Sequence, residues 1–387
     1  MGILFFIVFI DLVGFGIVIP LLPYYALTFH ASPFAVTMMM ACYSFAQFFS
    51  SPLLGRLSDR VGRKPVILAS LVCSVAAYVW LGFASSLWML FAARLLAGAG
   101  AGNIAAAQAY VSDVTPPAER AKGMGMIGAA FGLGFTLGPA IGGLLAGGDA
   151  NSAHLAWPAF LAAGFSAAAF VLALLRLDES LTHESRANAI ETRLAAAKKA
   201  YARPNLRLLI LLFFTITAAF AGMETTFALW AHEGFGWGPL QVGGIFFYVG
   251  IILVVVQGGL IGRLSKMFGE ARLVLAGTAC IALGLFSLPF ATVLWGVLAA
   301  TTLLSIGMAL FNPSLNSLIS QEAGPQERGG VLGVAQSAAS AARILGPAVA
   351  GAVYSGLGRN APYYLAAAVM AGVVFWVRRI PGAAARR

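Results

Sequence analysis

The sequence contains little charge. Only 10% of its 387 residues are Asp, Glu, Lys or Arg, whereas 60% are hydrophobic. A soluble domain averages about 25% charged and about 45–50% apolar residues. No water-soluble core hides so much apolar surface. The composition therefore disfavours a soluble enzyme, a disordered chain and a nucleic-acid-binding protein.

Residues that carry chemistry are also scarce. The three cysteines lie far apart within apolar runs, and the four histidines fall in loops or at the ends of such runs. This spacing matches neither a disulfide framework nor a metal site. No Walker, H-E-x-x-H or nucleophile-elbow signature appears. We therefore expect no enzymatic activity, metal, cofactor or ATP, and an ion gradient is the expected energy source.

What the chain has instead is a series of long apolar runs. A bilayer core about 30 Å thick needs about 20 apolar residues per helix. Twelve runs qualify, namely 3–27, 35–55, 66–84, 87–112, 123–147, 155–176, 206–232, 240–261, 272–291, 293–318, 329–353 and 361–379. The first contains Asp11 and lacks a basic leader and a cleavage site, so we expect a retained helix rather than a signal peptide. Its abrupt start leaves open whether native residues precede Met1.

The net charge of +10 indicates sidedness. If the N-terminus is cytoplasmic, 21 of the 24 lysines and arginines fall in cytoplasmic loops and the tail, and the exceptions are Arg94, Arg343 and Arg359. Positive charge collects on the cytoplasmic side of membrane proteins. The sequence thus predicts a multi-pass protein of the inner (cytoplasmic) membrane with both termini in the cytoplasm, and no nucleic-acid partner.

The two halves of the chain repeat each other. Glu119-Arg120 recurs as Glu327-Arg328, and Gly138-Pro139 recurs as Gly346-Pro347, both at the same offset (327 − 119 = 346 − 138 = 208). A polar segment separates the halves. We therefore expect an N-terminal six-helix bundle over 1–177, a cytoplasmic linker over 178–204 and a C-terminal six-helix bundle over 205–387. Six-helix halves around a central path are typical of a large class of secondary transporters.

A charged loop lies between the second and third runs. It reads Gly55-Arg56-Leu57-Ser58-Asp59-Arg60-Val61-Gly62-Arg63-Lys64-Pro65. Its basic residues suit a cytoplasmic loop, but the order of glycines, acid and bases is more specific than that. The loop resembles the signature loop of the major facilitator superfamily. This resemblance implies an all-α integral membrane fold with twelve transmembrane helices in two pseudo-symmetric six-helix bundles.

Other segments resemble the twelve-span drug:proton antiporter branch, and most of all tetracycline efflux proteins. The first run carries Asp11-Leu12-Val13-Gly14-Phe15-Gly16, the fourth carries Arg94 before three glycines, and the fifth carries Gly138-Pro139. Two features depart from the tetracycline pumps. Ala77 stands before Tyr78, where those pumps have an acidic residue, and the eighth run lacks their histidine. Both departures concern the substrate rather than the fold.

Four ionisable residues lie inside the runs: Asp11, Arg94, Glu224 and Arg343. A charge near the bilayer midplane costs about 2.5–3.5 kcal/mol, so such residues face a cavity or a partner. A carboxyl group that alternates between dry and wet surroundings takes up and releases a proton. We predict this role for Asp11 and Glu224, with permanently paired structural charges as the alternative. By resemblance Arg94 affects proton coupling, whereas Arg343 contacts substrate or forms a structural pair.

The resemblance also implies a conformational latch that holds the outward-open state. It comprises Gly55, Asp59, Arg60, Gly62, Arg63, Lys64 and Asp113. Asp113 is expected to pair with Arg60 and to join Asp59. The simpler alternative is a solvated acid at a helix end.

Small residues recur at every fourth position of the fifth run and form one stripe, which lets helices approach closely. A hinge or seal between the halves is one interpretation, and tight packing is the other. The predicted hinge residues are Gly134, Gly138, Pro139, Gly142, Gly143, Gly346 and Pro347.

Polar groups within apolar runs either bridge helices or face a water-filled cavity. The candidates for a substrate cavity are Gln47, Asn103, Gln108, Gln257, Asn312, Gln336 and Arg343.

These observations together predict a secondary active transporter in the lipid bilayer. It would export a small amphipathic compound in exchange for protons by alternating access, and it would work as a monomer. An uncoupled facilitator or a lipid flippase of the same fold is the alternative within transporters. A membrane receptor without transport is the alternative from another class.

Overall fold

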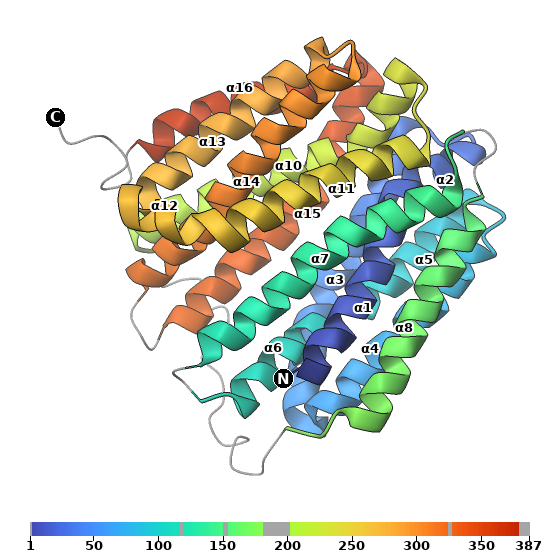
Figure 1. Cartoon of the computed structure of the whole chain (residues 1–387), viewed down its shortest axis with the longest axis vertical. Coiled ribbons are helices and arrows are strands. Elements are labelled where there is room, and N and C mark those ends of the chain that lie inside the picture. Colours follow the sequence, from blue (N-terminus) through green and yellow to red (C-terminus); the bar gives the residue numbers. More distant parts are fainter. Residues whose placement is uncertain (1, 117–118, 150–153, 181–201, 324–326, 379–387) are drawn as a thin grey trace. The chain divides into compact units, whose positions relative to one another are not determined.

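The computed structural model describes residues 2–116, 119–149, 154–180, 202–323 and 327–378. These residues are built from helices, and no strand occurs among them (Figure 1). Most of the predicted linker lies outside the described residues.

The contacts divide the chain into two compact units. Unit 1 comprises Met1–Ala189 and Ala231–Gly250, and unit 2 comprises Ile190–Trp230 and Ile251–Arg387. Residues 231–250 are thus grouped with the first unit. The predicted domain boundaries at 177 and 205 stay a prediction.

Among the described residues, nine helices begin within the N-terminal part of the chain. They are α1 (Gly2–Val18), η1 (Ile19–Leu21), α2 (Leu22–Thr28), α3 (Pro33–Val61), α4 (Arg63–Gly82), α5 (Leu87–Ala99), α6 (Asn103–Val114), α7 (Arg120–Ala146) and α8 (Ala156–Arg176). The later helices are α10 (Pro204–Phe235), α11 (Pro239–Val255), η3 (Val256–Leu260), α12 (Ile261–Phe268), α13 (Glu270–Ser287), η4 (Leu288–Phe290), α14 (Leu294–Glu322), α15 (Arg328–Leu357) and α16 (Ala361–Val377).

Each of the twelve predicted runs is helical in the described residues. Nine helical segments there are long and apolar enough to cross a membrane, and α16 is a shorter apolar helix. The other two, α3 and α15, have 29 and 30 residues. At about 1.5 Å per residue both exceed the thickness of a bilayer core. They are less apolar because α3 contains half of the charged loop and α15 is rich in Gly, Ser and Ala. The prediction of an all-helical membrane fold is confirmed for the described residues, and the number of twelve spans stays a prediction.

Breaks in the helices coincide with proline and glycine. Pro20 lies in the 3₁₀ turn η1 that interrupts the first segment. The π-helical turn η3 contains Gly258 and Gly259. Gly62 separates α3 from α4 and has a φ of 113°, a conformation that side chains with a Cβ rarely adopt.

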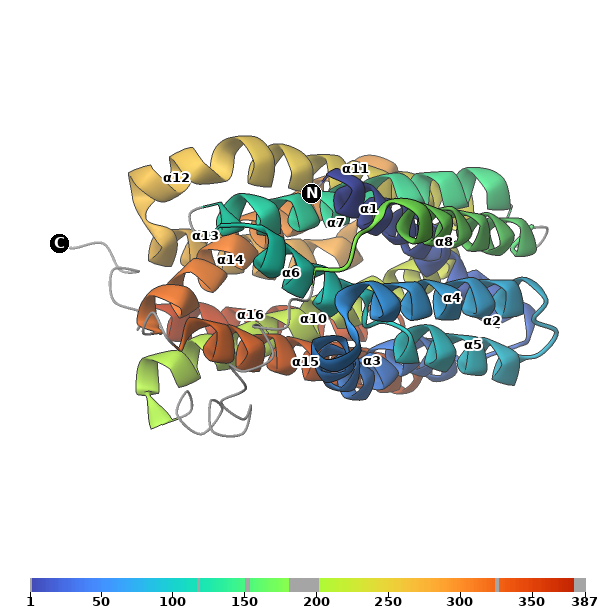
Figure 2. The same cartoon turned by 90° about the horizontal axis from the view of Figure 1, so that it is seen from below.

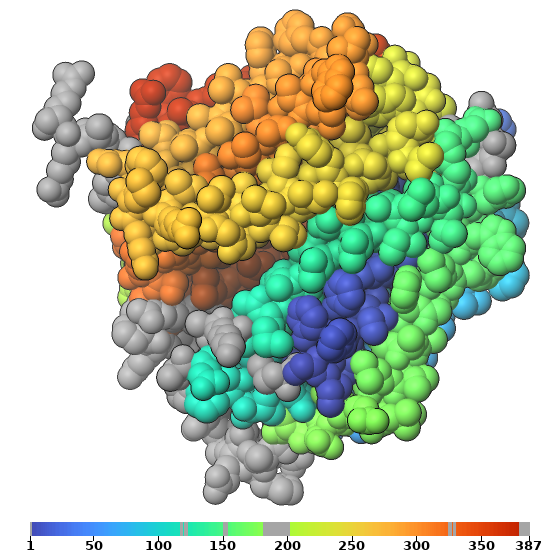
Figure 3. All heavy atoms as spheres, viewed as in Figure 1, coloured from blue at the N-terminus to red at the C-terminus, as the bar shows by residue number. Residues whose placement is uncertain are grey.

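Helix α1 forms the centre of one face of unit 1. It packs between α7 and α8, and Figure 3 shows it as a blue strip between these two helices. Figure 2 shows α4 beside α8 and α5, in agreement with its contacts. The core at the N-terminal end of α1 contains Leu4, Ile7, Leu71 and Val111. This packing places the middle of α1 away from solvent, and Asp11 lies there.

Candidate functional site

Asp11 is a buried acid held between three helices. Asp11 is only 6% exposed to solvent. Its Oδ2 accepts a hydrogen bond from Asn103 Nδ2 on α6 at 2.5 Å, and its Oδ1 accepts one from Ser166 Oγ on α8 at 2.7 Å. Both partners are neutral side chains. These two partners of the carboxyl group are thus neutral dipoles rather than cations.

A small cavity of about 20 Å³ adjoins Asp11. It is also lined by Tyr43, Ser74, Tyr78 and Asn103. A water molecule needs about 10–15 Å³ measured in this way, together with polar partners. The cavity therefore has the size and the polar lining to admit one water molecule to the carboxyl group.

Arg94 lies near this cavity without joining Asp11. The residue is 3% exposed, and its guanidinium lies over the ring of Tyr43 at 5.1 Å from the centroid. Its Nε is a buried donor with no hydrogen-bond partner in the described part of the chain. The expected depths of Asp11 and Arg94 in the bilayer left open whether the two side chains pair directly. The structure gives Asp11 neutral partners and Arg94 an aromatic one.

The predicted acid of the second half, Glu224, lies on α10 and is half-buried. Arg343 on α15 lies close enough to act on it electrostatically. Arg343 Nη2 also donates a hydrogen bond to Ser340 Oγ at 3.3 Å. Both interpretations of Arg343, substrate contact and structural pair, stay predictions.

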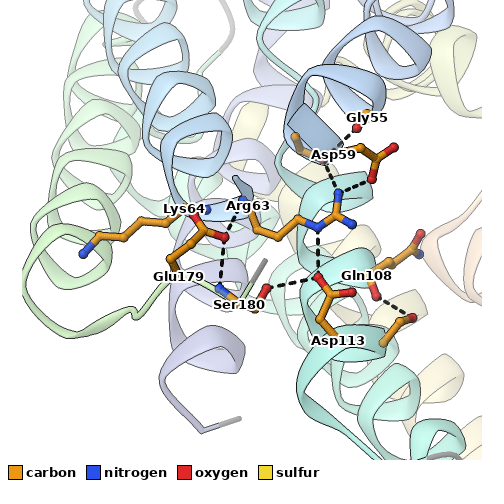
Figure 4. A network of polar contacts seen from close by, with 10 residues as sticks. Gly55, Asp59, Arg63, Lys64, Gln108, Asp113, Glu179 and Ser180 are labelled. Carbon is orange, nitrogen blue, oxygen red and sulfur yellow. Dashed lines mark hydrogen bonds and ion pairs between the residues drawn. The ribbon is translucent and has the colours of Figure 1, made fainter. Parts of the chain in front are cut away.

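The charged loop forms a compact network around Arg63, the first residue of α4 (Figure 4). Its Nε donates to Asp113 Oδ2 at 3.0 Å, and its Nη1 donates to Ser58 Oγ at 2.8 Å and to the Asp59 carboxylate. The Arg63 side chain is only 8% exposed. One guanidinium therefore ties together the end of α3, the start of α4 and the end of α6.

The segment after α8 completes this network. Glu179 accepts the backbone N–H of Arg63 at 2.8 Å and that of Lys64 at 3.1 Å. These are orphan donors of the first turn of α4, so Glu179 acts as a helix cap. A Cβ on Gly62 would lie 2.7 Å from Glu179 Cδ. Lack of space therefore disfavours a larger residue at this position, in addition to the positive φ. Ser180 Oγ donates to Asp113 at 3.1 Å.

The structure brings most of the predicted latch residues together. Lys64 Nζ donates to the carbonyl of Leu174 on α8 at 3.0 Å, and the Gly55 carbonyl accepts from the Ser58 hydroxyl at 2.7 Å. Asp113 is joined to Arg63, and its pairing with Arg60 stays a prediction. The sequence reasoning missed Glu179 and Ser180. Their signal was an acid and a hydroxyl directly after the sixth apolar run.

The small-residue stripe of α7 packs directly on α1. A Cβ on Gly138 would lie 2.6 Å from Gly16 Cα, and one on Gly134 would lie 2.8 Å from Leu12 Cβ. Gly346 on α15 lies against the backbone of Ala218 on α10 in the same way. These contacts confirm tight packing at both copies of the repeat.

The other four predicted hinge residues are buried in helices α7 and α15, namely Pro139, Gly142, Gly143 and Pro347. A Cβ on Gly143 would lie 2.7 Å from the carbonyl oxygen of Pro239 on α11. The hinge role of the whole set stays a prediction.

The cavity role of the other predicted residues stays a prediction. The side chain of Asn103 donates to Asp11. The backbone carbonyl of Asn312 accepts a hydrogen bond from Asn316 Nδ2 at 2.9 Å. The remaining positions are Gln47, which is half-buried, and Gln108, Gln257 and Gln336, which are exposed. Within the described ranges, no group of His, Cys, Asp and Glu is placed to hold a metal ion.

Comparison with known proteins gives a consistent family. The family model described as Major Facilitator Superfamily matches residues 4–343 and 258–387. The chain is 31% identical over 357 residues to the tetracycline resistance protein, class E, of Escherichia coli, covering 90% of this chain and 86% of that protein. It is 30% identical over 371 residues to multidrug resistance protein 2 of Bacillus subtilis (strain 168), covering 94% and 90%.

A solved structure shares the fold over the whole length. The crystal structure of the human organic anion transporter MFSD10 (TETRAN) matches with a TM-score of 0.74 and 25% sequence identity. The match covers 97% of this chain and 98% of that one. The relatives are transporters rather than enzymes, in agreement with the absence of a catalytic signature.

Proposed function

Because this chain belongs to the Major Facilitator Superfamily, we propose that it is a proton-coupled exporter of small amphipathic compounds. The observation that carries the proposal is the Asp11 carboxyl group, which is 6% exposed and hydrogen-bonded to two neutral side chains. A buried acid without a cationic partner changes its charge when its surroundings change between dry and wet. Alternating access imposes such a change once per cycle.

The second acid contributes differently. Glu224 is under the electrostatic influence of Arg343, so its proton exchange depends on where Arg343 moves. A substrate that engages Arg343 would weaken its hold on Glu224. This arrangement links substrate binding to proton binding in unit 2. In unit 1, Asp11 is a proton-binding site whose two hydrogen-bond partners are neutral.

The export direction and the substrate class come from the relatives. Two of them are named for resistance to tetracycline and to multiple drugs, and a transporter gives resistance by moving the drug out of the cell. Ala77 is buried beside Tyr78, at the position where tetracycline pumps carry an acid. We therefore propose small amphipathic compounds as the substrate class, with protons as the only coupling partner and a monomer as the working unit.

Positive residues in the loops orient both termini to the cytoplasm. The Arg63 network then lies on the cytoplasmic side, where it ties α3, α4 and α6 together in one conformation. Release of this network opens that side in the other half of the cycle.

The test uses the full chain in liposomes with an imposed pH gradient and a panel of amphipathic compounds. We expect at least one compound to be driven against its gradient, and we expect an ionophore that collapses the proton gradient to abolish this. Asp11→Asn should abolish this proton-driven transport, and Asp178→Asn, which removes an exposed acid outside the spans, is the matched control. Transport that continues after collapse supports the uncoupled facilitator instead. Binding without any flux supports the receptor.

A further inference from the structure

The two partners of Asp11 differ in the hydrogen bonds that they can form. The Oδ1 of Asn103 accepts the backbone N–H of Ile104 at 2.8 Å. This contact fixes the orientation of the amide, so the atom that faces Asp11 Oδ2 is the Nδ2 group. An amide NH₂ group only donates. A proton on Oδ2 would therefore meet another donor, and Oδ2 has to remain an acceptor.

The partner of the other oxygen has no such restriction. Ser166 is 0% exposed and its hydroxyl lies 2.7 Å from Asp11 Oδ1. A hydroxyl group donates and accepts. It therefore satisfies Oδ1 in both charge states of the acid.

We propose that the proton carried by Asp11 is held on Oδ1 and shared with Ser166, while Asn103 keeps Oδ2 as an acceptor. This inference rests on the proposed function, because it assigns positions to the proton that Asp11 exchanges. In the ionised state the Ser166 O–H donates to Oδ1. When a proton binds, Oδ1–H donates to Ser166 Oγ, and the serine hydroxyl turns to a carbonyl one turn earlier in α8, a common acceptor for serine in helices.

The surroundings of Asp11 contain few other groups that could hold this proton. Tyr43 on α3 and Tyr78 on α4 line the same small cavity, and Arg94 on α5 lies over the Tyr43 ring. Helices α7 and α8 present the glycine stripe and Ala162 to this part of α1. Asn103 and Ser166 are thus positioning residues, and the two hydrogen bonds to Asp11 both come from them.

Infrared difference spectroscopy during a pH titration tests this on the purified full chain in lipid. The C=O stretch of a protonated carboxyl group reports its own hydrogen bonding. Asp11→Asn identifies the band, since that band is lost. Ser166→Ala should move the band to higher wavenumber with little change in midpoint, because serine bonds both charge states. Ser166→Thr keeps the hydroxyl and should restore the wild-type frequency.

Asn103→Leu should differ in its midpoint. Asn103 donates to Oδ2 in both charge states, but more strongly to the carboxylate, so the half-protonation pH should rise by about one unit. The C=O band should also move to higher wavenumber, because Oδ2 is the carbonyl oxygen of the protonated acid. If Asn103→Leu does not fold, the two serine variants decide alone. A band that Ser166→Ala leaves in place overturns the inference while Asp11 remains a proton carrier. If Asp11→Asn removes no titrating band, proton carriage by Asp11 itself fails.

Discussion

Replacement of Glu179 by alanine should loosen the first turn of α4. The carboxylate accepts the backbone N–H groups of Arg63 and Lys64 at 2.8 and 3.1 Å. Loss of a helix cap costs about 0.5–2 kcal/mol, and loss of an anion at a helix N-terminus costs about 0.3–1 kcal/mol. Glu179 is exposed, so solvent screens part of the charge effect. A total of about 2 kcal/mol follows from these two ranges.

Amide hydrogen exchange measures this cost locally. A loss of about 2 kcal/mol should speed exchange of the Arg63 and Lys64 amides roughly 30-fold, since 1.4 kcal/mol corresponds to a factor of ten. Glu179→Gln retains one acceptor oxygen and should lie between wild type and Glu179→Ala. Asp178→Asn removes the same charge one residue away and serves as the matched control. Equal exchange in Glu179→Ala and Asp178→Asn would refute the capping role.

Two further predictions concern packing and the latch. Gly138→Ala should destabilise the protein by about 1–3 kcal/mol, because its Cβ would meet the Gly16 backbone. Gly128→Ala on the same helix is the control, since its Cβ would have no atom within 4 Å. The free energies of unfolding of the two variants are compared in mixed micelles, and equal values would contradict the close helix contact. A double-mutant cycle of Arg63→Gln with Asp113→Asn should give a coupling energy of about 1–3 kcal/mol. The same cycle with Arg60→Gln should give less, and a larger value would support the Arg60 pairing instead.

The helical segments were predictable because the signal is long and redundant. About 20 apolar residues per span mark a helix even when Pro or Gly interrupts it. The grouping of the end of α10 and the start of α11 with unit 1 was not predictable, since hydropathy does not report which helices touch. Gly143 against Pro239 is a contact of this kind.

The sites were predictable only in part. The cost of a charge in a membrane singles out Asp11, but it does not name the partners of the acid. Ser166 is a lone hydroxyl in an alanine-rich run, and such hydroxyls usually bond their own helix. Asn103 was expected at a substrate cavity for the same reason that it serves Asp11, since a buried amide needs a partner. The structure shows its bond to Asp11, and its role at a substrate cavity stays a prediction.

The exchange of a proton at Asp11 during transport is the central claim. Its most direct measurement compares two assays of Asp11→Asn in the same liposomes: substrate-induced proton flux, and exchange of labelled for unlabelled substrate without a gradient. The account predicts that proton flux falls to the background while substrate exchange persists. Proton flux at the wild-type rate in Asp11→Asn would contradict it.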